Sequence, residues 1–222
     1  MTKIYLVRHC EALGNLRRVF QGTTDLDITD LGEKQLEKLS ERFDGIKLDK
    51  IYSSPLIRAY KTALAIKGNR DIEIEIYKDL SEIDGGIIEG KPFTDTLEKD
   101  PVLKEIWLNH PEDFAPEGGE PMRESYQRIT NAFWDIVNQN KGKTVALATH
   151  GGIIRCLLCK LIYDDISKLI TVPLFDNTAV GYIEIDDSNK IELKFINDYS
   201  HLPSDMLRSS SRPSLYTMRD NK

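Results

Sequence analysis

Short runs of β-branched and other apolar residues alternate with segments of helical periodicity in the first part of the chain. The runs predict strands, and they are Lys3–Val7, Lys50–Ser53, Ile72–Tyr77 and, after a long interval, Thr144–Thr149. Asp30–Phe43 carries leucines at helical spacing, and Ser54 followed by Pro55 predicts the N-cap and first position of another helix. Strands that alternate with helices are typical of an α/β fold with a largely parallel sheet.

The interval 84–139 departs from this alternation. It combines glycine-rich loops with helical stretches at Thr94–Leu108 and Met122–Val137. We interpret it as a helical insertion that packs near the sheet rather than as an independent domain. Two further apolar runs, Val180–Ile185 and Ile191–Ile196, are separated by a turn-like D-D-S-N sequence and predict a terminal antiparallel hairpin.

This organisation predicts a single domain over residues 1–202. Residues 203–222 are polar and rich in serine, so we expect a loosely ordered tail there. Nothing in the pattern indicates an oligomeric state.

Composition narrows the class of protein. The 222 residues are 40% hydrophobic and 30% charged, which suits a soluble protein with a packed core. No apolar run approaches the roughly 20 residues that cross a bilayer, and the N-terminal segment is charged again at Arg8. The net charge of −6 gives no sign of the basic face of a nucleic-acid-binding protein. We therefore expect a cytoplasmic protein that binds neither nucleic acid nor membrane.

The three cysteines are an odd number without a disulfide framework, which suits a reducing compartment. Cys156 and Cys159 form a single C-L-L-C sequence. They fit either a metal or redox pair or two small apolar residues on a buried helix. Because no second pair accompanies them, we expect the buried helix.

Two of the four histidines share one context. His9 and His150 each follow an apolar strand directly, where the chain turns. In open α/β sheets, ligands bind outside the carboxyl ends of the strands. Arg8 precedes His9, and Arg58 lies in the first turn of a helix that follows a strand, so both can bring positive charge to this edge. Two histidines and two arginines at strand-end turns are a set of side chains suited to a phosphoryl group.

A carboxyl group is needed if such a pocket is to do acid–base chemistry. Glu82 follows the third predicted strand and so lies near the same edge of the sheet, and its neighbour Asp84 is an alternative. A carboxyl group beside an anionic substrate tends to keep its proton, which is what a general acid for a leaving alkoxide requires.

These residues carry a resemblance to a known family. The shared motifs occur in order along the chain: L-V-R-H-C-E at 6–11, Asn15, Q-G at 21–22, S-S-P-L-I-R-A-Y-K-T-A at 53–63, L-S-E at 80–82 and T-H-G-G at 149–152. Together they closely resemble the histidine phosphatase (phosphoglycerate mutase-like) superfamily. The resemblance runs from about Lys3 to His201 and implies a three-layer α/β/α fold with a mostly parallel central sheet.

The resemblance also implies a two-step mechanism on the residues found above. His9 would attack phosphorus and become a phosphohistidine, and Glu82 would protonate the leaving oxygen and then activate water. Further residues would hold the phosphoryl oxygens or line the pocket: Arg8, Asn15, Gln21, Gly22, Arg58, His150 and Gly151. Fixed cations would replace a metal ion, so we expect no metal and no cofactor.

One position departs from the family pattern. The family usually has glycine after the first histidine, and this chain has Cys10. Cysteine there suggests slightly altered backbone packing, and we interpret it as a tolerated small residue rather than as part of the mechanism.

A second motif points to another class of phosphatase. Asp25–Thr29 spells D-x-D-x-T, the nucleophile motif of haloacid dehalogenase-like phosphatases. That motif should end a hydrophobic strand, whereas a loop-like sequence precedes it here. Thr29 instead has the features of a helix cap, so we reject an aspartyl-phosphate mechanism. G-x-S-x-G and P-loop motifs are missing from the sequence.

Three functions remain to be compared. The sequence favours a metal-independent phosphomonoesterase acting on a small phosphorylated metabolite. A phosphoglycerate mutase is the alternative, but Glu82 and His150 are only 68 residues apart, whereas cofactor-dependent mutases have extra sequence in this interval that excludes water. A non-catalytic phospho-ligand binding protein should lack the nucleophile or the acid, and both are present. The substrate is not specified: Arg17 and Arg18 either meet a second anionic group or face water.

Overall fold

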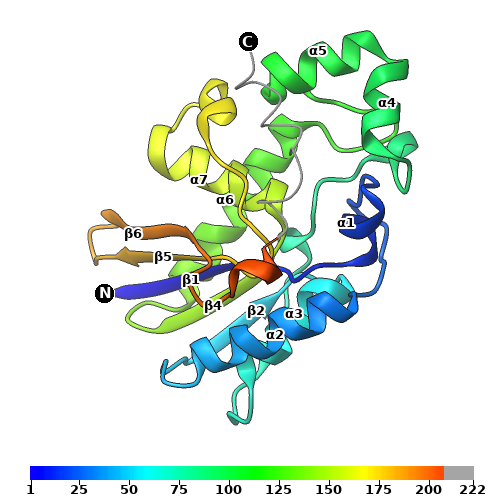
Figure 1. Ribbon diagram of the computed structural model, residues 1–222. Helices are drawn as coiled ribbons and strands as arrows, with labels where there is room; N and C mark the ends of the chain where they lie inside the picture. The colour runs from blue at the N-terminus through cyan, green and yellow to red at the C-terminus, as the bar shows by residue number, and fades with distance from the viewer. Residues whose placement is uncertain (208–222) are drawn as a thin grey trace.

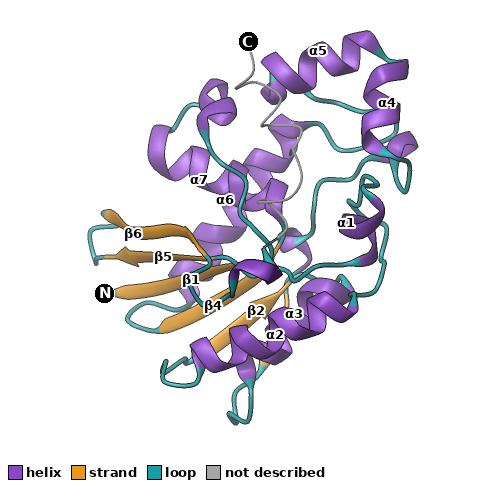
Figure 2. Cartoon of the chain, in the orientation of Figure 1, coloured by secondary structure: helices purple, strands orange, loops and turns teal. Residues whose placement is uncertain are grey.

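The computed structural model describes residues 1–207. Within this part, strands and helices alternate as Figures 1 and 2 show. The strands are β1 Thr2–Arg8, β2 Lys50–Ser53, β3 Ile74–Ile76, β4 Thr144–Thr149, β5 Val180–Ile185 and β6 Ile191–Asp198. The α-helices are α1 Leu13–Arg17, α2 Asp30–Phe43, α3 Ile57–Lys67, α4 Phe93–Lys99, α5 Pro101–Asn109, α6 Met122–Gln139 and α7 Gly151–Tyr163.

The strands of the described chain form one sheet in the order β3-β2-β4-β1-β5-β6. β3, β2, β4 and β1 are parallel to one another, β5 is antiparallel to β1, and β6 is antiparallel to β5. The predicted α/β fold with a mostly parallel sheet and a terminal hairpin is therefore confirmed. β1 and β4 pair in the centre of the sheet, with Arg8 opposite Thr149. This register brings the residues that follow the two strands to the same edge.

Side chains that alternate along the central strands face two separate cores. Leu6 and Leu147 pack in the larger core, which α6 and α7 cover, whereas Val7 and Ala148 pack in a smaller core beneath α2 and α3. Because successive strand side chains point to opposite faces, a central strand in such a fold is apolar throughout. This explains the near-continuous apolar runs of the sequence.

The structure corrects several expected element boundaries. The helix expected from Ser54 begins at Ile57, with Leu56 as its N-cap. The stretch expected to be helical over Thr94–Leu108 forms two helices, because Asp100 caps α5 through its side chain and Pro101 occupies its first position. The third strand is only Ile74–Ile76, at the edge of the sheet.

The interval between β3 and β4 contains α4, α5 and α6. Figure 1 shows α4 and α5 beyond α6, away from the sheet, while α6 packs beside α7. After β6 the chain makes a 3₁₀ turn at Ser204–Met206, and the Met206 carbonyl accepts a hydrogen bond from Gln35 Nε2 of α2. The rest of the expected tail, residues 208–222, lies outside the described residues.

Candidate active site

His9 follows β1 and is almost completely buried. Its Nδ1 lies 2.6 Å from the Cys10 carbonyl oxygen, and because a carbonyl can only accept, Nδ1 carries the proton. Nε2 is then the nitrogen with a free lone pair. The backbone on both sides is fixed: the His9 amide donates to the Thr149 carbonyl, and the His9 carbonyl accepts from Asn177 Nδ2 at 2.9 Å.

The surroundings of His9 keep its ring neutral. Burial lowers the pKa of His9 well below its usual value, and the nearby positive charges of Arg58 and Arg8 lower it further. A neutral imidazole with one tethered nitrogen and one bare nitrogen is a competent nucleophile. The arrangement therefore suits attack by His9 Nε2 on an electrophile such as phosphorus.

His150 follows β4 and is the N-cap residue of α7. Its ring centroid lies 5.1 Å from that of His9. Its Nε2 lies 2.7 Å from the hydroxyl oxygen of Ser54, and its Nδ1 is buried with no hydrogen-bond partner in the described chain. Burial, followed by the charge of Arg58, lowers the pKa of His150 well below its usual value.

The two predicted arginines act electrostatically on both histidines. Arg58 is fully buried in the first turn of α3, and Arg8 is the last residue of β1 and donates to the Phe175 carbonyl. Burial lowers the pKa of Arg58 to about 10, so it stays positively charged at neutral pH. In the described chain, the Nε of each arginine has no hydrogen-bond partner. One buried and one half-buried cation, each with an unused donor, are suited to bind an anion.

Arg58 also holds the loop that carries two other predicted residues. Its guanidinium donates to the carbonyl oxygens of Gln21 at 3.0 Å, Gly22 at 2.8 Å and Thr24 at 3.0 Å. The Gln21 side-chain amide is buried without a partner in the described chain. A Cβ atom at Gly22 would lie 2.0 Å from the Ile83 carbonyl oxygen, so the close approach of these two loops requires glycine there.

Glu82 reaches the same edge of the sheet, as its place after β3 predicts. Its carboxylate accepts hydrogen bonds from the backbone amides of Gly152 at 3.0 Å and Ile153 at 3.1 Å, in the first turn of α7. Asp84, the alternative acid, instead accepts from the Gly86 amide in its own turn. The geometry favours Glu82, because it contacts the helix that His150 begins.

The remaining predicted residues lie around this group. Asn15 Oδ1 accepts from the Ala12 amide and lies 3.5 Å from Asn177 Nδ2, which also binds the His9 carbonyl. A Cβ atom at Gly151 would lie 3.1 Å from Arg8 Nε. Glycine at 151 thus allows the start of α7 to approach the guanidinium closely.

Sequence reasoning missed four supporting residues. Asn177 and Phe175 bind the backbone of His9 and the side chain of Arg8, respectively. Ser54 was expected to cap a helix and instead contacts His150. Glu89 accepts from the amides of the loop at 22–24. Phe175 and Asn177 lie at this edge because β5 runs antiparallel to β1, so the residues just before β5 are at the carboxyl edge of the parallel strands.

The other candidate motifs have structural explanations. Thr29 Oγ1 accepts from the Gly32 amide and caps α2 as expected, and Asp25 accepts from the Ile57 amide at the start of α3. Cys156 and Cys159 are buried on α7, and burial raises the pKa of the Cys159 thiol to about 11. Burial likewise raises the pKa of Cys10 to about 12.

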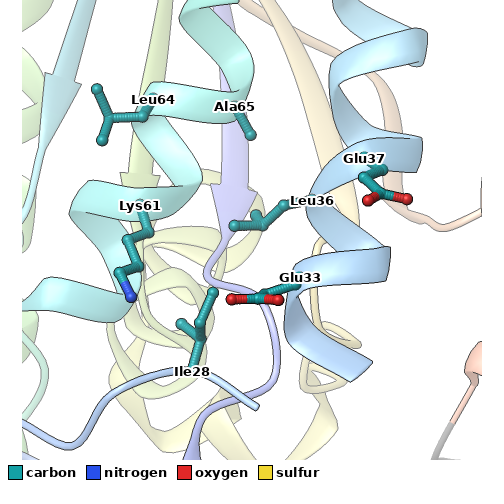
Figure 3. Close-up of a pocket in the computed structure, with 7 residues that line it drawn as sticks. All are labelled: Ile28, Glu33, Leu36, Glu37, Lys61, Leu64 and Ala65. Atoms are coloured by element: carbon teal, nitrogen blue, oxygen red, sulfur yellow. The ribbon is translucent and has the colours of Figure 1, made fainter. Parts of the chain in front are cut away.

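A surface pocket lies elsewhere on the molecule. Figure 3 shows it between α2 and α3, where Leu36 and Leu64 line it together with Glu33, Glu37 and Lys61. None of the predicted site residues lines this pocket, so it is separate from the candidate active site. In residues 1–207, no helix combines the length and the hydropathy needed to cross a membrane.

The geometry of two histidines, two arginines and a glutamate can be compared with known proteins. The profile of the histidine phosphatase superfamily (branch 1) matches residues 4–198. This chain belongs to the histidine phosphatase superfamily. Phosphoserine phosphatase 1 of Hydrogenobacter thermophilus is 31% identical over 202 residues, covering 91% of this chain and 95% of the relative. The metal-independent phosphoserine phosphatase of Arabidopsis thaliana is 31% identical over 207 residues, covering 92% and 84%.

Solved structures agree with this assignment. Bacillus stearothermophilus YhfR superposes with a TM-score of 0.85 at 31% identity and covers 90% of this chain and 99% of its own. A phosphoserine phosphatase mutant from Entamoeba histolytica, in complex with phosphoserine, superposes with a TM-score of 0.81 at 26% identity, covering 91% and 100%. This histidine phosphatase is thus a phosphoric monoester hydrolase with the phosphoglycerate mutase-like fold.

Proposed function

We propose that this histidine phosphatase hydrolyses small, carboxylate-bearing phosphomonoesters of the phosphoserine type through a phosphohistidine on His9. The single observation that carries the mechanism is the state of His9: its Nδ1 is bound to the Cys10 carbonyl, and its ring lies within the electrostatic influence of Arg58 and Arg8. The substrate class is supported by the phosphoserine phosphatases among the relatives and solved structures.

In the first step, His9 Nε2 attacks phosphorus while the bond from phosphorus to the ester oxygen breaks. Glu82 gives its proton to the leaving oxygen, so the alcohol departs neutral. Arg8, Arg58 and His150 bind the remaining phosphoryl oxygens.

In the second step, the Glu82 carboxylate takes a proton from water, and the water oxygen attacks phosphorus. The bond between phosphorus and His9 Nε2 breaks, and inorganic phosphate leaves. Glu82 is again protonated and His9 again neutral, so the cycle closes without a net change in the enzyme. Fixed cations carry the charge in both steps, and no metal ion is required by this scheme.

The test is phosphate release in excess EDTA from phosphoserine, 3-phosphoglycerate and p-nitrophenyl phosphate. We expect release from all three, with phosphoserine preferred. His9→Ala should lower kcat by about 10³-fold or more, because removing a nucleophile disables the whole catalytic unit. The exposed His110 offers a matched control, and His110→Ala should keep full activity.

Two further outcomes separate the alternatives. Interconversion of 2- and 3-phosphoglycerate without phosphate release would indicate a mutase. If the protein neither releases phosphate nor forms an acid-labile phosphoenzyme that can be trapped, it is a binding protein.

Glu82→Gln should lower activity on phosphoserine more than on p-nitrophenyl phosphate, whose leaving group needs less protonation. Equal losses on both substrates would contradict Glu82 as the acid.

A further inference from the structure

Ser54 is placed beside His150 by the sheet itself. It follows β2 directly, and its amide donates to the Ala148 carbonyl of β4 at 3.0 Å. Two residues further along β4, the chain reaches His150. Ser54 is fully buried, so its hydroxyl group must find its hydrogen-bond partners inside the protein.

The partners of that hydroxyl group define the direction of its hydrogen bond. In the described chain, the Ser54 hydroxyl oxygen has two partners: the Leu56 amide at 3.3 Å and His150 Nε2 at 2.7 Å. A backbone amide can only donate, whereas a serine hydroxyl has one proton to give. Of these two partners only His150 Nε2 can accept, so the buried Ser54 proton is satisfied when it is donated to His150 Nε2.

This direction decides where the ring of His150 carries its own proton. A neutral imidazole has one donor nitrogen and one acceptor nitrogen, so an accepting Nε2 leaves the proton on Nδ1. Nδ1 is buried and has no hydrogen-bond partner among the described residues. The centroid of the ring lies 5.1 Å from that of His9, and the positive charges of Arg58 and Arg8 help to lower its pKa.

We propose that Ser54 is a positioning residue, which holds His150 in the Nδ1–H tautomer so that this N–H donates to a phosphoryl oxygen of the substrate. The role rests on the proposed function. The opposite tautomer would leave the Ser54 proton without an acceptor in the described chain. It would also point the lone pair of Nδ1 at an anion, which is repulsive. Residues that orient a functional histidine in this way commonly change activity by about 10- to 100-fold.

The first measurement needs no catalysis. A long-range ¹H–¹⁵N spectrum of histidine reports the tautomer of each ring, and this chain has only four histidines to assign. Assignment uses His150→Gln and His9→Gln. At pH 7.5 we expect wild-type His150 with a protonated Nδ1 and an unprotonated Nε2. A protonated Nε2 on wild-type His150 would overturn the proposal, whatever the activity of the enzyme.

The second measurement uses variants at the same site. Ser54→Ala should convert His150 to a mixture of tautomers and lower kcat/KM for p-nitrophenyl phosphate by about 10- to 100-fold. Ser54→Thr keeps the hydroxyl group and should restore the Nδ1–H signal. The matched control is Ser53→Ala, because Ser53 is equally buried and its hydroxyl donates to the Ser54 carbonyl.

The outcomes separate this inference from the proposed function. Ser54→Ala with an unchanged tautomer and unchanged kcat/KM would refute the positioning role. If Ser54→Ala does not fold, the wild-type tautomer decides the question alone. Failure to trap a phosphoenzyme on His9 would refute the proposed mechanism instead, and the tautomer of His150 would still be measured independently.

Discussion

His9, the proposed nucleophile, has its pKa lowered by burial and by two arginines, with no carboxylate partner to raise it. In a site built for an anionic substrate, this has a physical reason. Positive charge that binds the phosphoryl group also disfavours an imidazolium ring close by. In the proposed mechanism the same two arginines would bind the substrate and also keep His9 in its neutral, nucleophilic form.

The lowered pKa of His9 makes a prediction for the pH profile. Ordinary histidines become protonated below about pH 6.5, whereas His9 should stay neutral well below that value. We expect kcat/KM, corrected for the second ionisation of the phosphate ester near pH 6, to stay level from pH 7.5 to 5.5. A corrected profile that falls with an apparent pKa near 6.5 would mean that His9 or His150 titrates normally. The measurement is a pH–rate profile with p-nitrophenyl phosphate.

At the residue scale, the sequence indicates the candidate site residues more readily than the residues whose contacts hold them in place. His9, His150, Arg8 and Arg58 could be found because each follows a strand or begins a helix beside one. Their supporting contacts could not be found in this way. The Ser54–His150 contact, for example, depends on which way two strands pair, and that pairing is a long-range property of the sheet.

At the scale of elements, the loop at residues 21–24 is held from two sides. Arg58 donates to its carbonyl oxygens, and Glu89 accepts from its amides at Gly22, Thr23 and Thr24 and from the Gly85 amide at 2.8 Å. Several backbone N–H groups thus converge on the Glu89 carboxylate, in the way that such groups converge on a bound anion. This loop carries Gln21, a predicted phosphate-binding residue, so we expect the rigidity of the loop to affect substrate binding.

Glu89→Gln should loosen this loop. The amide group has one acceptor oxygen instead of two, and its NH₂ group would face backbone donors, so partly buried donors lose partners at a cost of about 1 kcal/mol. We expect a several-fold higher KM for p-nitrophenyl phosphate and a lower midpoint in urea unfolding. Glu98→Gln, on the exposed face of α4, is the matched control and should change neither. An unchanged KM in Glu89→Gln would mean that Arg58 alone holds the loop.

The boundaries of elements show where local sequence signals are incomplete. Ser54 and Pro55 carry a helix-start signal, yet α3 begins at Ile57 because Asp25, which is remote in sequence, accepts from the Ile57 amide. The break between α4 and α5 carries a clear local signal in Asp100 and Pro101. The break was not predicted, because the helical pattern of the sequence continues through these two residues. Tertiary contacts therefore decided the first boundary, and local capping decided the second.

At the scale of the whole molecule, hydrogen bonds connect the C-terminal end of β6 to the carboxyl edge of the parallel strands, where the candidate active site lies. Arg42 of α2 binds the Asp198 carboxylate at 2.6 Å and donates to His201 Nδ1 at 3.0 Å. His201 Nε2 then lies 3.3 Å from Thr178 Oγ1, and the Thr178 amide donates to the Arg8 carbonyl. The hairpin and the residues after it thus support the strand that carries Arg8 and His9, a link that no local sequence pattern predicts.

This network makes stability depend on pH through His201. Burial and the charge of Arg42 lower the pKa of His201 to about 4, whereas in the unfolded chain the ring titrates near 6.5. The unfolded state therefore binds the proton first as the solution is acidified. The contribution of His201 to the free energy of unfolding is complete above about pH 6.5 and is lost as pH falls toward 4.

Comparison with His201→Gln isolates this contribution from those of His9 and His150, whose pKa values are lowered in the same direction. Because His201 is partly exposed, solvent screening reduces the expected effect to about 1–2 kcal/mol. Urea unfolding at pH 4.5, 5.5, 6.5 and 7.5 should show the wild type losing that much more stability than the variant between pH 6.5 and 4.5. Asp198, whose pKa is lowered to about 2, loses its own contribution only below this window. Parallel curves for the two proteins would mean that the His201 ring titrates alike in the folded and unfolded chain, and that Arg42 does not hold it neutral.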